Sequence, residues 1–266
     1  MSPAKHNLLE GSIFPHITRL AIPILIGDIL QQLYNAVDSI IVGRFLGTEA
    51  FAAVGVAGTI MNLCIFLLNG FCLGIAALMS MLYGRRDYDA FRKEMYVSLS
   101  LGTGIAIGVS ALFLIFMKPL ALLISTPAEL INYLTEYLTI IIAGLICTYF
   151  YNLFTGVLNA VGDTRTGLYF LTLSVTLNIL LDWLLVGPVQ LGIKGAAIAT
   201  VTAQAVSAAG CYAFLRKKYG TLLCTRKDIG KHTELISQTL QRGISTALHQ
   251  SSLYIGKLLV QVKYSG

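Results

Sequence analysis

Long apolar runs separated by short polar segments dominate the pattern along the chain. Because one crossing of the hydrocarbon core takes about 20 mainly apolar residues, each such run predicts a membrane-spanning helix. Six runs are clear, at residues 13–42, 50–83, 97–124, 130–161, 166–186 and 191–215. A seventh, at 243–262, is weaker because it contains Ser245, His249, Gln250 and Lys257. The pattern predicts an all-α membrane protein: a six-helix transmembrane lobe plus a partial seventh helix.

The composition agrees with lipid as the solvent. Of the 266 residues, 56% are hydrophobic and only 12% are charged, whereas a typical soluble domain has about 25% charged residues. An ordinary water-soluble enzyme is therefore excluded, and membrane lipid is an expected partner. The net charge of +6 does not indicate a nucleic-acid partner, because the basic residues lie in short loops rather than along one face.

The basic residues predict the orientation in the membrane. Of the 19 lysines and arginines, only three fall on the side opposite the N-terminus, in a loop or near the end of a run, and two in or just after the last run are unassigned. The three are Arg44, Lys118 and Lys194, and the unassigned pair is Lys257 and Lys263. The other fourteen fall on the side of the N-terminus, and cytoplasmic loops retain positive charge during insertion. We expect a multi-pass protein of the plasma (inner) membrane with a cytoplasmic N-terminus.

Nothing in the chain has the spacing of an enzyme or transition-metal site. Four of the five cysteines fall inside apolar runs and the fifth, Cys224, lies in a polar segment, with no ligand-like spacing. The four histidines have no accompanying Ser-His-Asp pattern. We expect no catalytic residues and no organic cofactor.

Among the carboxylates inside predicted spans, three are the clearest candidates: Asp28 and Asp38 in the first and Asp182 in the fifth. Ionisable residues are costly in lipid, so they normally face a cavity or a partner and mark ion or substrate paths. Tyr34 and Asp38 are four residues apart, as are Asn178 and Asp182, so each pair shares a helix face. Two helices thus each present a carboxylate with a hydrogen-bonding neighbour one turn away.

Helix rise places these polar residues at similar depths. Asp38 and Asp182 each come five residues before the glycine that ends their span, which puts both about 8 Å inside the outer boundary. Thr200 and Tyr137 enter from the same side on the sixth and fourth spans and lie deeper, at about 14 Å. The similar depths of these residues on four helices predict one cation- or proton-binding site. Its members are Asp38, Asp182, Asn178, Thr200, Tyr34 and Tyr137. Oxygen ligands of this kind suit a proton relay or Na⁺. The expected Na⁺ ligands are Asp38, Asn178, Asp182 and Thr200.

A structural interpretation remains open for part of this set. Asp38, Asn178 and Asp182 can form an interhelical hydrogen bond with no ion involved. Two carboxylates are, however, a costly way to make one structural bond. A tyrosine at the position of Tyr137 is more often an interfacial or packing aromatic than a ligand.

Two further features of the first span bear on function. Asp28 lies ten residues from Asp38 and about 80° round the helix, so it need not share the same cavity. It is a candidate for an additional protonatable site. Pro23, followed by Gly27, predicts a kink or hinge, because proline removes one backbone hydrogen bond and clashes with the preceding turn.

At these residues the chain resembles the multidrug and toxic compound extrusion (MATE) transporters. The first span carries the resemblance through Pro23, Gln31, Gln32, Leu33, Tyr34, Asn35, Asp38, Val42, Gly43 and Arg44. The later matches are the loop Gly162-Asp163-Thr164-Arg165, the pair Asn178 and Asp182, and the run Gly195-Ala196-Ala197-Ile198-Ala199-Thr200. The similarity covers nearly all of residues 10–261, and its order and spacing are more specific than any single motif.

The resemblance implies an antiporter of two six-helix lobes that exports cationic or amphiphilic compounds, coupled to Na⁺ or H⁺ entry by alternating access. It also implies that the six residues grouped by depth form the cation network, whereas Asp28 departs from the uncharged polar residue expected there. On this reading residues 1–218 are the N-terminal lobe, 219–242 a cytoplasmic inter-lobe linker and 243–266 the start of a truncated second lobe. The missing C-terminal lobe would then be a partner.

A weak internal repeat supports this division. Aligning the chain with itself at an offset of 218 places Leu30 on Leu248, Gln32 on Gln250 and Val42 on Val260. Two alternatives stay open: a lipid-linked precursor flippase of the same superfamily, and a non-transporting truncated remnant. The flippase is disfavoured because pyrophosphate recognition needs basic residues in the cavity. The only lysines and arginines in the six clear spans are Arg19, Lys118 and Lys194, and each lies near an end of its span.

Overall fold

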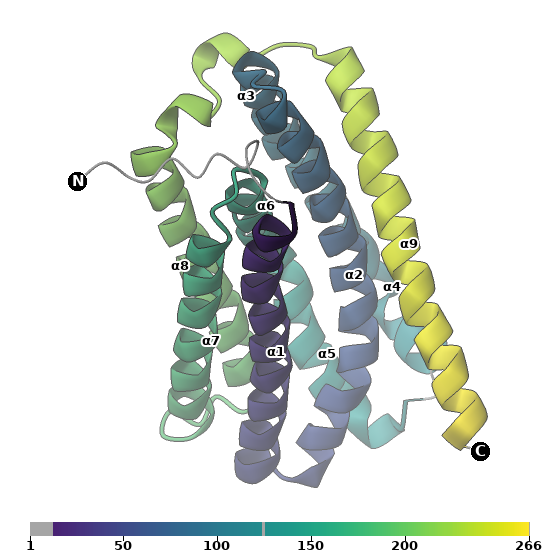
Figure 1. The fold of residues 1–266 in the computed structure, drawn as a ribbon. Helices are drawn as coiled ribbons and strands as arrows, with labels where there is room; N and C mark the ends of the chain where they lie inside the picture. The colour runs from purple at the N-terminus through teal and green to yellow at the C-terminus, as the bar shows by residue number, and fades with distance from the viewer. Residues whose placement is uncertain (1–12, 124–125, 266) are drawn as a thin grey trace.

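Long helices joined by short loops make up the structure (Figure 1). The computed structural model describes residues 13–123 and 126–265, except for the side chains of 13–17, 19, 20, 28, 35, 123 and 253–265. The long helices before residue 124 are α1 (Ile13–Leu46), α2 (Thr48–Gly84), α3 (Tyr88–Val97) and α4 (Thr103–Leu123). Those that follow are α5 (Ala128–Ala143), α6 (Leu145–Ala160), α7 (Thr164–Val186), α8 (Ile193–Lys218) and α9 (Thr233–Ser265). Three short helices complete the described part: η1 (Ser98–Gly102), η2 (Gly220–Leu222) and η3 (Arg226–Asp228).

The helices confirm the all-α membrane fold that the apolar runs predict. In the described residues, α2, α7, α8 and the continuous α3–α4 segment are each long and apolar enough to cross a membrane. The bent pair α5 and α6 meets the same criterion as one further span. The first predicted span corresponds to α1, which packs against α7 and α2. A single residue, Gly47, separates α1 from α2, and its φ of +89° lies in the left-handed region that favours glycine.

Two spans are less regular than their apolar runs predict. The fourth bends by 45° at Gly144, between α5 and α6. A Cβ at Gly144 would lie 2.3 Å from a methyl of Val201. The absence of a side chain at Gly144 therefore lets α8 approach the bend closely. The third begins at Tyr88, well before the predicted start, and passes through the π-helical turn η1. At this turn Gly102 leaves room for the hydroxyl of Tyr149, which donates a 2.6 Å hydrogen bond to the Ser98 carbonyl.

Apolar side chains cover the outside of the bundle as well as its core. Ile115 is 72% exposed and Tyr169 is 71% exposed, whereas Leu134, Leu138 and Ile142 are buried. In water such a surface would be a liability. An apolar outer surface is expected of a helix bundle that is surrounded by lipid.

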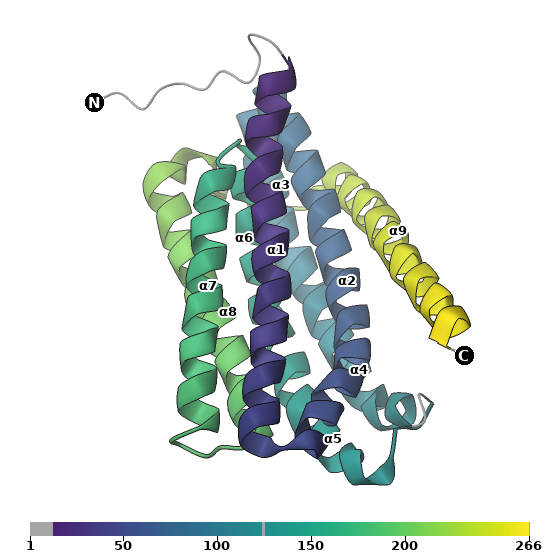
Figure 2. The same ribbon diagram turned by 60° about the horizontal axis from the view of Figure 1, so that its bottom comes forward.

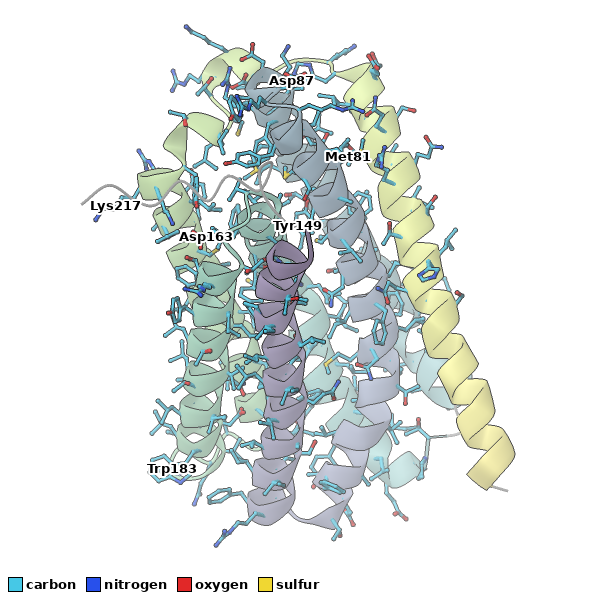
Figure 3. The ribbon with its side chains drawn as sticks, viewed as in Figure 1. Met81, Asp87, Tyr149, Asp163, Trp183 and Lys217 are labelled. Atoms are coloured by element: carbon cyan, nitrogen blue, oxygen red, sulfur yellow. The ribbon has the colours of Figure 1, made fainter. Side chains whose placement is uncertain are left out.

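The polar loops gather at the two ends of the bundle. Figure 3 shows Asp87, Asp163 and Lys217 toward one end and Trp183 at the other. The α2–α3 turn with Arg85 and Arg86 lies at the same end as the segment after α8 (Figure 1). We call this the basic end. The loops predicted to carry few basic residues lie at the opposite end.

The last helix, α9, begins earlier than the seventh apolar run. It starts at Thr233 because Leu235, Ile236, Thr239 and Leu240, at helical spacing, turn toward the bundle between exposed polar residues. It packs against α2 and α3 near the basic end, and Figure 2 shows it diverging from α2 toward its C-terminal end.

Candidate functional site

The structure brings the six grouped polar side chains together between α1, α5, α7 and α8. Asp38, Tyr137, Asn178, Asp182 and Thr200 are buried, and Asp182 has 0% exposed surface. Tyr34 is half-buried. We call this set the carboxyl pair site. Its members come from four helices that are far apart in the sequence, as the depth argument expects.

Thr200 on α8 is the hydrogen-bonding centre of one half of the carboxyl pair site. Its Oγ1 lies 3.0 Å from the hydroxyl of Tyr34 on α1, and the two share a hydrogen bond. The side-chain amide of Asn178 on α7 donates to the same Oγ1 over 3.3 Å. One hydroxyl therefore ties α1, α7 and α8 together at this level.

The other half of the site holds two carboxyls side by side. Asp38 lies in direct contact with Asp182 and with the hydroxyl of Tyr137. A hydrogen bond between two carboxyls needs a proton on one of them. Four buried oxygens of the site have no hydrogen-bond donor: Asp38 Oδ1, Asn178 Oδ1, and both carboxyl oxygens of Asp182.

The four oxygens without a donor are acceptors, and no cationic side chain among those described compensates them. Among the described side chains, neither carboxyl forms an ion pair with lysine, arginine or histidine. Two like charges in a low-dielectric site repel strongly. Such a site favours uptake of a positive charge, and carboxylate, amide and hydroxyl oxygens fit either Na⁺ or a proton.

The structure describes one of the other two candidate residues of α1, Pro23, but not the side chain of the other, Asp28, which lies outside the described residues. Pro23 is buried within α1, which is one helix through this position. Whether Pro23 acts as a hinge stays a prediction.

A cavity of about 150 Å³ opens between α1, α6 and α7, nearer the basic end than the carboxyl pair site. Pro23, Gly27 and Gln31 line its α1 wall, and Asn152 and Asn159 line its α6 wall. Its walls combine amide groups with apolar side chains such as Leu168 and Leu171. The asparagines carried no sequence signal, because one amide every seven residues in an apolar helix resembles ordinary interhelical bonding.

Asp163, in the loop after α6, caps α7 and joins it to α8. Its Oδ1 accepts from the Thr166 hydroxyl over 2.8 Å and from the Thr166 backbone N–H over 3.4 Å. Its Oδ2 accepts from Lys218 over 2.7 Å and from the Tyr219 hydroxyl over 3.0 Å. Burial acts to raise the pKa of Asp163, but the bonds from Lys218, Thr166 and Tyr219 outweigh it and hold the pKa below its ordinary value.

A second buried carboxyl, Glu94 on α3, was not among the sequence candidates. It accepts hydrogen bonds from Ser98 and Thr239 and has no exposed surface. The sequence places it among Arg92, Lys93 and other polar residues before an apolar run. Nothing in that pattern distinguishes it from a solvated loop residue.

Comparisons with known proteins agree on one family. The MatE family profile matches residues 23–184. The chain is 28% identical to the probable multidrug resistance protein YpnP of Bacillus subtilis, over 76% of this chain and 45% of that protein. It is 24% identical to the multidrug export protein MepA of Staphylococcus haemolyticus, over 90% of this chain and 53% of that protein.

Solved structures give the same result. A MATE transporter of the MOP superfamily in its outward-facing conformation superposes with a TM-score of 0.88 and 27% identity, covering 97% of this chain and 57% of that one. The chain thus spans about half the length of the relatives it matches. The family profile, these relatives and the fold together show that this chain belongs to the MatE family of multi-pass membrane transporters.

Proposed function

We propose that this chain is the N-terminal lobe of a multidrug efflux antiporter. Residues 1–218 would form the lobe, 219–242 the cytoplasmic linker, and 243–266 the start of a second lobe. Support comes from the relatives, which are named as multidrug resistance and export proteins and are about twice as long. The basic end would face the cytoplasm of the cell, because positively charged loops are retained there.

One observation carries the proposal: two buried carboxyls, Asp38 and Asp182, lie side by side, and neither pairs with a cationic group among the described side chains. A transporter driven by a cation gradient needs a site whose energy changes greatly when the cation binds. Here the empty site holds like charges in low dielectric, and a bound Na⁺ or proton relieves that repulsion. Asn178, Thr200, Tyr34 and Tyr137 supply the surrounding oxygens.

The same site can transmit cation binding to the helices around it. When the repulsion between Asp38 and Asp182 is relieved, α1, α7 and α8 can approach and repack, since each carries a member of the site. Pro23 lies on α1 between the site and the basic end, where a bend would alter the cavity wall. Such coupling is reciprocal, so the cation and the exported compound should weaken each other's binding.

The cavity between α1, α6 and α7 suits an amphiphilic substrate. Gln31, Asn152 and Asn159 offer amide groups, while Leu168 and Leu171 offer apolar contact. None of the described residues that line it has a charged side chain that would select an anion. We propose that cationic or amphiphilic small molecules are the substrates.

Transport in proteoliposomes tests the proposal. The full-length gene product, with any coding sequence after residue 266, would be reconstituted with a fluorescent cationic dye under an imposed Na⁺ or pH gradient. Asp38→Asn and Asp182→Asn should each abolish gradient-driven dye transport. Glu49→Gln is the matched control, because Glu49 is an exposed carboxyl at the same end of the bundle. Cation-driven transport that survives in Asp38→Asn would show the mechanism to be wrong.

A further inference from the structure

Glu94 is a buried carboxyl remote from the carboxyl pair site, at the contact between α3 and α9. Its exposed fraction is 0%. Thr239 Oγ1 on α9 lies 2.9 Å from each of its two carboxyl oxygens, and Ser98 Oγ lies 3.0 Å from Oε1. The proposed transport function uses none of these groups.

The hydroxyl protons available around Glu94 are too few for a carboxylate. Thr239 has one hydroxyl proton, and its Oγ1 also lies 2.7 Å from the Leu235 carbonyl of its own helix. If that proton goes to Leu235, only Ser98 is left to donate to Glu94. A proton on Glu94 removes the conflict, because Glu94 then donates to Thr239, and Thr239 donates to Leu235.

No positively charged group among the described side chains pairs with Glu94. Among the described side chains it forms no ion pair, and the nearest arginine on its helix, Arg92, pairs with Asp89 and Asp228 instead. An ionised carboxylate with no counter-charge and few donors is costly to bury, whereas the neutral acid is not.

The other groups packed around α3 do not supply that charge. Tyr149 on α6 is within electrostatic range both of Glu94 and of Cys72 on α2. Both are ordinarily neutral near pH 7. On α9, Glu234 and Arg242 flank Thr239 in the sequence without pairing to Glu94.

Just beyond the Glu94–Thr239 contact, α9 makes its closest approach to α2. A Cβ on Gly74 would lie 2.7 Å from the backbone of Arg242 and Gly243, and one on Gly70 would lie 2.5 Å from the Cα of Ala247. Helices this close are held by many short contacts, so a small displacement of either disrupts the interface. Glu94 thus lies where a local change can detach α9, which diverges from α2 beyond this region (Figure 2).

We propose that Glu94 is a proton-binding site, and that its protonated carboxyl fastens α9 to α3 through Thr239. Loss of the proton leaves a buried charge with too few hydrogen-bond donors, so α9 separates from α3 at this point and water completes the bonds. The inference goes beyond the proposed transport function and does not depend on it, because it concerns protonation and helix position.

Infrared spectroscopy of the chain in lipid nanodiscs tests the protonation. The experiment uses Asp38→Asn, Asp182→Asn as background, which silences the carboxyl pair site. The band of a protonated carboxyl should persist at neutral pH in this background and disappear in the added variant Glu94→Gln. The matched control is Glu234→Gln, because Glu234 is exposed on α9, and it should keep the band. A band unchanged by Glu94→Gln would overturn the proposal.

Spin-label distances test the attachment of α9. Labels at Ser237 on α9 and Lys217 on α8, both exposed positions, are introduced after Cys147 and Cys224 are replaced by serine. With rising pH the distance should lengthen in wild type and in Glu234→Gln, but stay short in Glu94→Gln, which is always neutral. Thr239→Val, which lacks the partner hydroxyl, should show the longer distance already at low pH. A wild-type pH response in Glu94→Gln, or a short distance in Thr239→Val at low pH, would refute the attachment.

Discussion

Asp163 makes two contributions to the stability of the lobe, and two substitutions should separate them. Asp163→Ala removes the cap of α7 and the link to α8, whereas Asp163→Asn keeps a good capping residue and loses the charge. Asp163 has a side chain only 14% exposed, with Lys218 and Tyr219 bound to one oxygen and Thr166 to the other. The two substitutions therefore separate the local cap from the long-range contacts.

The magnitudes follow from the surroundings of each bond. Loss of an N-cap costs about 1 kcal/mol, and a buried hydroxyl bond such as that from Tyr219 contributes about 1 kcal/mol. Lys218 is 45% exposed, so solvent limits its ion pair to at most about 1 kcal/mol. We expect Asp163→Ala to lower the free energy of unfolding by about 3 kcal/mol and Asp163→Asn by about half of that.

Acid should remove the same stabilisation from the wild-type protein. The pKa of Asp163 is lower in the folded protein than its ordinary value. Its contribution is therefore complete above the ordinary pKa and is lost as the pH falls through the folded pKa. Asp163→Asn has no such group and should lack this part of the acid sensitivity.

Denaturant unfolding in detergent measures these differences. The chain has one tryptophan, Trp183 on α7, whose fluorescence reports on the helix that Asp163 caps. In a double-mutant cycle, Asp163→Asn and Lys218→Met should cost less together than the two separate losses combined. Equal destabilisation by asparagine and alanine, or full additivity with Lys218→Met, would refute this account of Asp163.

Two further substitutions test other contacts. Thr200→Val removes the oxygen that Tyr34 and Asn178 share, so Na⁺ or proton binding to the lobe, measured by cation-dependent thermal stabilisation, should weaken about tenfold. Thr172→Val, at an exposed threonine bonded only to its own helix, should leave cation binding unchanged. Gly74→Ala forces α9 away from α2 and should cost about 1–3 kcal/mol in denaturant unfolding. Gly58→Ala, which meets open space on the same helix, should be neutral or stabilising; equal effects of the two would contradict the close-packing argument.

Much of the fold could be predicted because lipid imposes a simple rule on each segment. Any run that crosses the hydrocarbon must be apolar for about 20 residues, so each of the six clear runs corresponds to one span, although two of those spans contain more than one helix. The break at Gly144 could not be predicted this way, because it depends on Val201, a residue 57 positions later on α8, filling the space of a missing Cβ. The start of α9 at Thr233 could not be predicted from the apolar run either, because the first turns of this helix are polar on one side.

The candidate site was likewise predictable in part: the sequence gives the depth of each residue but not its contacts. Depth along each helix is a one-dimensional quantity, so helix rise alone could group Asp38 with Asp182. Direct contact between them depends also on how each helix is rotated and on which helices are neighbours, which only packing decides. Glu94 is the contrasting case, because its significance depends entirely on Thr239, which approaches from 145 residues away.

The sequence by itself determined which segments enter the membrane, the clustering of basic residues at one end, and a set of costly polar residues at one depth. The tertiary structure alone decided that the two carboxyls share one site with no cationic partner among the described side chains, that Thr200 joins three helices, and that α9 lies against α2 and α3. The reason is physical: transfer of a segment into lipid is a sum over its own residues. Burial and pairing of a side chain are instead properties of its neighbours in space.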